Sequence, residues 1–214
     1  RSSAASDVYK RQALTSCVLL AAGNGVAQQN YSKSEGLLQY VDPYIGSGYH
    51  GHVFVGTSVP YGMVQLGPTN IHKGWDWCSG YHYSDSILIG FSHTHLSGTG
   101  CTDLCDILIM PLNEIRTPRG NQDDVRDGYA SRYSHANEIA RPEYYSLLLD
   151  RYNIKAELTA TDRVGFHRYT YPEGKPASIL IDLREGNGSN AYDSYIRKVD
   201  DYTVAVSYTH LTLP

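Results

Sequence analysis

Histidine is concentrated in one part of this 214-residue chain, where six of its nine copies fall between positions 50 and 95. His50 and His52 form one pair with a single residue between them, and His93 and His95 form another. On a β-strand this spacing places both rings on one face, which is the geometry that a metal needs from paired imidazoles. A metal-dependent enzyme of the cupin type is therefore one hypothesis, although no glutamate follows within residues 96–100. We favour the alternative that these histidines hydrogen-bond in a polar cleft, since neutral imidazole has one donor and one acceptor.

Both tryptophans lie in one short segment and enclose a carboxylate, in the order Trp75, Asp76, Trp77. Indole faces stack on the apolar C–H faces of sugars, and a neighbouring carboxylate can hold two hydroxyls. The segment is therefore a candidate carbohydrate platform. The alternative is that both rings belong to the core and Asp76 faces solvent. On a strand the two rings share a face, so displaying only one requires the irregular backbone that Gly74 and Gly80 allow.

Composition limits the other classes of function. The net charge is −4 and 19% of residues are charged, so no basic face predicts nucleic-acid binding. The chain has no nucleophile elbow, phosphate-binding loop or dinucleotide fingerprint. Nineteen tyrosines against three phenylalanines suit half-buried strands and hydroxyl-rich clefts.

The two ends of the chain do not read as part of a domain. We interpret residues 1–12 and 207–214 as foreign sequence, so that the natural start and stop are both missing. Residues 13–27 are typical of the remains of a secretory signal, whose apolar run is too short to span a membrane. Residues 28–36 are a polar, flexible lead-in. These features predict a secreted or periplasmic protein, with a surface lipoprotein modified at Cys17 as the less favoured alternative.

Three cysteines remain if Cys17 leaves with the signal, namely Cys78, Cys101 and Cys105. An odd number excludes a complete internal disulfide framework, and the spacing is not that of a zinc site. We expect small buried side chains, with at most one bridge, between Cys101 and Cys105.

Short β-patterned runs dominate the rest of the chain. Residues 154–160 alternate small or apolar side chains with polar ones, which predicts a strand with one buried face, and 164–169 are its expected hairpin partner. Further strands are predicted at 37–41, 63–66, 87–89, 107–110 and 178–183, and a loop is expected over 113–143. No segment has a convincing helical period. Antiparallel strands about ten residues apart predict an all-β sandwich or barrel.

Several uncommon motifs occur in a fixed order. The stretches VDPYIGSGYHGHVFVGTSVPYGMVQLGP, GWDWCSGYHY, IGFSHTHLSGTG, DILIMP and YYSLLLDRYNIKAELTATDRVGFHRYTYP resemble the start of glycoside hydrolase family 92, over residues 38–200. The resemblance implies a secreted or periplasmic, exo-acting, inverting and calcium-dependent α-mannosidase that trims mannose from N-glycans. It also implies an antiparallel, supersandwich-like β-sandwich, incomplete over 37–206, joined to a helical (α/α)6 barrel that is absent from this chain.

The same resemblance predicts which domain carries the catalytic groups and which carries substrate contacts. An inverting glycosidase needs two carboxyl groups about 6.5–9.5 Å apart, and in the family these groups and most calcium ligands lie on the barrel. We therefore assign no catalytic residue to this chain and leave metal-binding residues unknown. The expected partners are a mannose-containing N-glycan and the missing barrel domain, without nucleic acid or a membrane span. The predicted substrate-binding residues are Trp75 and Trp77 as sugar platforms, with Asp76, His52, His93 and His95 as polar contacts.

One departure from the family pattern and one further hypothesis remain. Cys101 and Cys105 stand where family members tend to have small or apolar residues, which puts the conformation of their loop in question. Besides the mannosidase fragment and the cupin-type enzyme, the third hypothesis is a free-standing carbohydrate-binding sandwich.

Overall fold

The computed structural model describes residues 36–38, 40–121, 125–187 and 191–209. The chain divides into two units at residue 42, and the predicted signal segment lies outside the described residues. In the first unit, residues 36–38 form a helical turn. The N–H groups of Tyr40 and Val41 donate three residues back, to Leu37 O at 3.0 Å and Leu38 O at 3.1 Å. The prediction of a strand at 37–41 is therefore wrong, because these donors are used within the turn.

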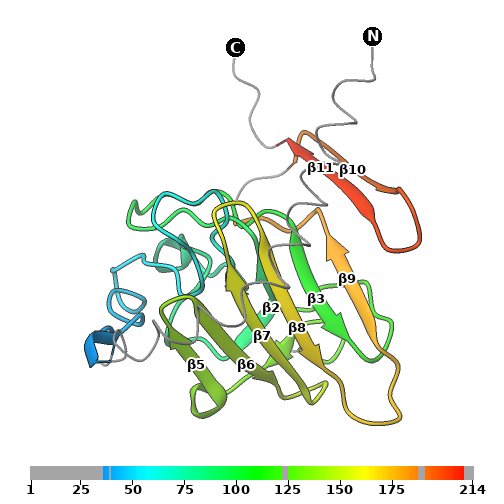
Figure 1. The fold of residues 1–214 in the computed structure, drawn as a ribbon, viewed down its shortest axis with the longest axis horizontal. Helices are drawn as coiled ribbons and strands as arrows, with labels where there is room; N and C mark the ends of the chain where they lie inside the picture. Colours follow the sequence, from blue (N-terminus) through cyan, green and yellow to red (C-terminus); the bar gives the residue numbers. More distant parts are fainter. Residues whose placement is uncertain (1–35, 39, 122–124, 188–190, 210–214) are drawn as a thin grey trace, which may run out of the picture. The chain divides into compact units, whose positions relative to one another are not determined.

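Two larger antiparallel sheets and a separate two-stranded hairpin occur in the second unit (Figure 1). The first has the order β1-β2-β3-β9, with β4 also paired to β2. The second has the order β5-β6-β7-β8, and in Figure 1 it lies in front of the first. The strands of the first sheet are β1 Gly67–Asn70, β2 Ile87–Ser92, β3 Leu108–Leu112, β4 Ser131–Arg132 and β9 Ser178–Asp182. Those of the second are β5 Glu138–Arg141, β6 Tyr144–Leu149, β7 Ile154–Ala160 and β8 Gly165–Thr170.

The hairpin of β7 and β8 confirms the clearest pattern in the sequence. Ala160 pairs with Gly165 next to the turn, and Lys155 pairs with Thr170 at the far end. Ile154 and the other even-numbered residues of β7 are buried, whereas Lys155 and Thr159 are exposed, as a period of two requires.

The core fills the space between the two sheets. The β2, β3 and β9 sheet contributes Leu88, Phe91 and Met110, and the opposite sheet contributes residues such as Leu147 and Ile154. Four of the largest fully buried side chains are tyrosines: Tyr81, Tyr129, Tyr145 and Tyr152. Their hydroxyls are hydrogen-bonded. The many tyrosines of the sequence therefore include residues packed in the core as well as residues exposed on the surface. The architecture confirms the predicted antiparallel β-sandwich.

The segment expected to be a loop, 113–143, contains regular structure instead. It holds β4, the 3-10 helix η3 at His135–Asn137 and β5. The β5 pattern was hidden because its polar residue Glu138 faces inward and its apolar residue Ile139 faces solvent. A buried glutamate is not a strand signal, so periodicity could not find this strand.

The predicted strand at 63–66 is also wrong. Only Leu66 makes a bridge, to Thr57, and β1 begins one residue later. The N–H groups of Met63 and Gln65 instead donate to Asp162 O at 2.7 Å and His93 O at 2.9 Å. Carbonyl groups in loops of both sheets therefore accept the hydrogen bonds of this backbone segment.

A separate hairpin ends the described chain. β10 Asp193–Lys198 pairs with β11 Val204–Thr209, and every residue of β10 is exposed. No helix within the described ranges is long and apolar enough to cross a membrane.

Candidate functional site

The tryptophan segment folds as a 3-10 helix, η2, over Trp75–Trp77. Gly74 precedes it with φ of 121°, a conformation that glycine adopts readily. A 3-10 helix has three residues per turn, so side chains two positions apart point in different directions. Trp75 is 59% exposed, whereas Trp77 is half-buried. The segment is a helical turn and not a strand, and this irregular backbone, which the glycines allow, is the reason that only one ring is displayed.

Trp77 is held by its neighbours. Its Nε1 donates to Asp85 Oδ2 at 2.8 Å, and Lys73 Nζ lies 2.8 Å from the same oxygen. The His82 ring stacks on the indole with centroids 4.3 Å apart and an angle of 24°. Trp77 therefore anchors η2 to the loop that follows it.

Trp75 presents its indole to solvent. Its Nε1 donates to Gly100 O at 2.8 Å. The His52 ring and the Trp75 ring form a T-shaped contact, with their centroids 4.2 Å apart. A Cβ on Gly100 would lie 3.2 Å from Trp75 Nε1, so a glycine is needed for this close approach. The loop after β2 thus fixes the orientation of the exposed ring.

Two histidines converge on the carboxylate beside that ring. His50 Nδ1 lies 2.5 Å from Asp76 Oδ1, and His52 Nε2 lies 3.6 Å from the same oxygen. No strand brings them together: the chain turns through His52, which has φ of 56°. The His50 hydrogen bond lowers the pKa of Asp76, which keeps it ionised at neutral pH. His52 is buried, and its Nε2 has no hydrogen-bond partner among the described residues.

This arrangement combines an exposed aromatic face with an ionised acceptor and an exposed imidazole. The His50 side chain is 72% exposed, and that of Asp76 is 30% exposed. A pyranose ring presents an apolar C–H face and a rim of hydroxyls, and the cluster of Trp75, Asp76, His50 and His52 offers a partner to each. We call these four residues the Trp75 cluster.

His95 does not belong to the cluster. Its side chain is buried, its Nδ1 donates to Gln65 O at 2.7 Å, and its ring stacks on Phe54. Burial lowers the pKa of His95 to about 4. A Cβ on Gly80 would lie 3.1 Å from the His95 ring, so this histidine supports the loop after Trp77 from beneath.

His93 faces the opposite sheet. Its Nδ1 donates to Ile107 O at 2.9 Å, and its Nε2 lies 3.1 Å from His167 Nε2 on β8. Since His93 Nε2 is then the acceptor, His167 donates to it and accepts from Tyr169 Oη at 2.6 Å. Burial lowers the pKa of both histidines. The prediction that His93 and His95 share a strand face is wrong, because β2 ends at Ser92.

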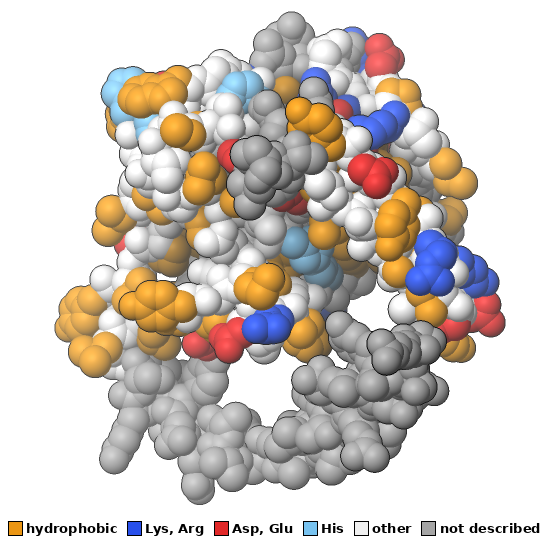
Figure 2. Space-filling view, turned by 90° about the horizontal axis from the view of Figure 1, so that it is seen from above, with side chains coloured by type: hydrophobic (Ala, Val, Ile, Leu, Met, Phe, Trp, Pro, Cys, Tyr) orange, Lys and Arg blue, Asp and Glu red, His pale blue; other side chains and the backbone are white. Residues whose placement is uncertain are grey.

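The structure also decides the questions of metal and disulfide. In the described part of the chain, no group of three or more His, Cys, Asp or Glu side chains is arranged to hold a metal. Figure 2 shows histidines reaching the surface at separate places. The geometry behind the cupin hypothesis is therefore not found at His93 and His95. Cys78, Cys101 and Cys105 are free, so the structure contains no bridge between Cys101 and Cys105. The expected burial is confirmed for Cys78 and Cys105 and is wrong for Cys101, which is exposed.

Sequence reasoning missed three contributors to this site. His50 was seen in a spaced pair but was not named as a contact, and His82 and Asp85 were not connected to Trp77. The only signal for His82 was its position five residues after Trp77.

Comparison with protein families gives one match over most of the chain. The model of the glycosyl hydrolase family 92 N-terminal domain matches residues 40–211. An uncharacterized secreted glycosidase of Arthroderma benhamiae is 32% identical over 162 residues. That alignment covers 70% of this chain and 20% of the relative, so the chain spans about a fifth of the relative's length.

Solved structures agree with this match. A family 92 α-mannosidase from Bacteroides thetaiotaomicron, in complex with mannoimidazole, is 41% identical with a TM-score of 0.75. The match covers 77% of this chain and 22% of that one. A second family 92 glycosyl hydrolase is 28% identical with a TM-score of 0.66, covering 80% and 24%. A family 92 inverting mannosidase, also from Bacteroides thetaiotaomicron, shares the fold at 20% identity and a TM-score of 0.57, covering 81% and 28%.

Proposed function

Because this chain belongs to glycosyl hydrolase family 92, whose N-terminal domain it matches over residues 40–211, we propose that it is the sugar-binding β-sandwich of a secreted exo-α-mannosidase. The observation that carries the proposal is the Trp75 cluster, in which a 59% exposed indole lies beside an ionised carboxylate. The description of one relative as an α-mannosidase bound to mannoimidazole supports mannose as the sugar.

In this proposal, Trp75 stacks on the apolar face of a terminal mannose. Asp76 accepts hydrogen bonds from its hydroxyls, and His50 adds a second polar contact. Trp77 acts through η2, because Asp85 and His82 already occupy its N–H and one ring surface. His93 and His95 hold the framework under this site.

Hydrolysis itself is assigned to sequence beyond this chain. We propose that the two catalytic carboxylates, the inversion of configuration and the N-glycan preference belong to the longer protein, whose relatives are about four to five times the length matched here. An inverting site needs carboxyl groups about 6.5–9.5 Å apart across the scissile bond.

Calcium is proposed for the longer protein as well. Calcium takes about six to eight oxygen ligands, whereas the Trp75 cluster has one carboxylate flanked by imidazole nitrogens. The residues of this cluster do not fit calcium, and we assign no step to the ion here.

Sugar binding can be tested on the 214-residue chain. Titration with methyl α-mannoside or mannoimidazole, followed by calorimetry, is expected to show weak binding that Trp75→Ala reduces at least tenfold. Phe166→Ala is the matched control, since Phe166 is an aromatic residue 48% exposed on β8. Equal affinity of Trp75→Ala and the wild type would overturn the assignment.

A further inference from the structure

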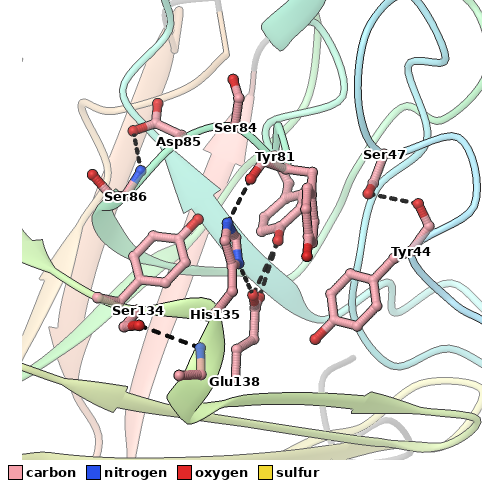
Figure 3. Close-up of polar contacts among 12 residues, drawn as sticks. Tyr44, Ser47, Tyr81, Ser84, Asp85, Ser86, Ser134, His135 and Glu138 are labelled. Atoms are coloured by element: carbon pink, nitrogen blue, oxygen red, sulfur yellow. Dashed lines mark hydrogen bonds and ion pairs between the residues drawn. The ribbon is translucent and has the colours of Figure 1, made fainter.

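A buried carboxylate lies at the start of β5. The Glu138 side chain is fully buried, so its charge requires partners. Tyr145 Oη donates to Oε1 at 2.6 Å, and Tyr81 Oη lies 3.2 Å from each oxygen. His135 Nδ1 lies 2.5 Å from Oε2. In Figure 3 the Glu138 carboxylate points toward the His135 ring and accepts a hydrogen bond from the Tyr81 hydroxyl.

The His135 ring lies between two oxygen atoms. Its Nε2 is 2.5 Å from Tyr83 O, and a carbonyl oxygen can only accept, so Nε2 carries a hydrogen. A neutral ring would then direct the lone pair of Nδ1 at an ionised carboxylate oxygen 2.5 Å away. This contact would be repulsive. One additional proton must therefore lie between Nδ1 and Oε2.

We infer that His135 and Glu138 share one proton, and that this pair positions the loop at residues 81–83, which supports the Trp75 cluster. The protonation part of the inference follows from the geometry of the pair alone. The positioning part rests on the proposed function. Neither residue contacts the sugar in this proposal, so both are positioning residues.

The pair holds the loop at its two ends. Tyr81 is bound through its hydroxyl, and Tyr83 through its carbonyl and through its ring, which stacks on His135 with centroids 4.2 Å apart. Between them, His82 stacks on Trp77 and its Nε2 donates to Tyr49 O at 3.2 Å. Tyr49 directly precedes His50 of the cluster. These contacts connect the His135–Glu138 pair to the Trp75 cluster.

Four phenols around the pair stay protonated. Burial raises the pKa of Tyr81, Tyr133, Tyr145 and Tyr44. The ring of Tyr133 meets His135 edge-on. The nearby Asp85 is paired with Lys73 at 2.8 Å. The contact between His135 Nδ1 and Glu138 Oε2 is therefore the place in this network where the geometry requires an additional proton.

The protonation can be measured directly in the isotope-labelled 214-residue chain by NMR at pH 7.5. The ¹⁵N shifts of His135 and the ¹³C shift of the Glu138 carboxyl are expected to show a proton on Nδ1 or on the carboxyl. An unprotonated Nδ1 together with an ionised carboxylate would overturn the inference, whatever the protein binds.

Glu138→Gln is the informative variant, since its amide N–H can donate to Nδ1 of a neutral ring. We expect it to keep methyl α-mannoside affinity within twofold, whereas Glu138→Leu, which cannot accept from Tyr81 and Tyr145, should lose at least threefold. His135→Phe keeps a ring against Tyr83 but removes the donor to Tyr83 O and the contact with Glu138 Oε2, and should lose affinity.

Two results would overturn the positioning role, namely equal affinities of Glu138→Gln and Glu138→Leu, or unchanged affinity of His135→Phe. If His135→Phe does not fold, the comparison of Glu138→Gln with Glu138→Leu decides. Absence of mannoside binding by the wild type would count against the proposed function and the positioning role together, and the NMR measurement would still test the proton.

Discussion

At the scale of single residues, the two tryptophans have different surroundings although one residue separates them. Trp75 is exposed beside Asp76, whereas Trp77 is tied by its N–H and covered by His82. The difference arises from the 3-10 turn, which rotates successive side chains about 120° apart. The two tryptophans therefore have different roles in the proposed function: Trp75 contacts the sugar, and Trp77 holds the segment in place.

His95 gives a prediction about acid stability. Its pKa is lowered to about 4 in the folded state, so below about pH 6.5 the unfolded chain binds a proton that the folded chain does not. Stability should therefore fall as the pH decreases from about 6.5 to about 4, by up to about 3 kcal/mol from this residue. His95→Gln, which still offers a donor to Gln65 O, should flatten the curve in urea unfolding experiments at several pH values. An unchanged slope would contradict this assignment.

Gly80 gives a prediction about packing under the site. Its φ is +84°, and a Cβ there would lie 2.4 Å from Cys105 Sγ. Gly80→Ala should cost about 2–4 kcal/mol, combining overpacking with backbone strain. Gly174→Ala has a similar φ of +72° with no atom within 4 Å, and should cost only about 1 kcal/mol. Denaturant unfolding compares the two, and equal losses would exclude the steric explanation.

At the scale of elements, the two kinds of hairpin should differ in stability. β7 has strands on both sides and a buried face, whereas β10 and β11 pair only with each other among the described strands. β10 is exposed throughout and β11 is only partly covered, and a two-stranded hairpin with so little burial is marginal in water. Hydrogen exchange should therefore be slow in β7, near the global unfolding limit, and fast in β10 and β11. Comparable protection of both would mean that β10 and β11 have a packing partner.

At the scale of the whole molecule, the chain covers only 20–28% of its matched relatives. We predict that the 214-residue chain does not hydrolyse 4-nitrophenyl α-mannoside, because we propose that the catalytic carboxylates lie in the longer protein. A version extended to the length of the relatives should hydrolyse it, release β-mannose first, and lose activity to a chelator until calcium is restored. Turnover by the short chain would refute this division of roles.

Local patterns in the sequence were sufficient for the fold class and the family. The alternation in β7 survives folding because each side chain of a strand faces the side opposite to its neighbours. The motifs that resemble family 92 likewise carried the identity. The Trp-Asp-Trp segment located the exposed indole of Trp75, although not its 3-10 backbone.

Only the tertiary structure decided which polar residues meet. His50 and His52 reach Asp76 across about twenty-five residues of chain, and Glu138 reaches Tyr81 across 57. Such contacts depend on loops whose conformation is set by their surroundings, as at His52 with φ of 56°. The sequence by itself indicated a β-sandwich whose Trp-Asp-Trp segment displays an aromatic ring beside a carboxylate. Long-range packing determined that His93 and His95 support the framework and that the half-buried His135 pairs with the buried Glu138, because neither partner's position follows from its own local pattern.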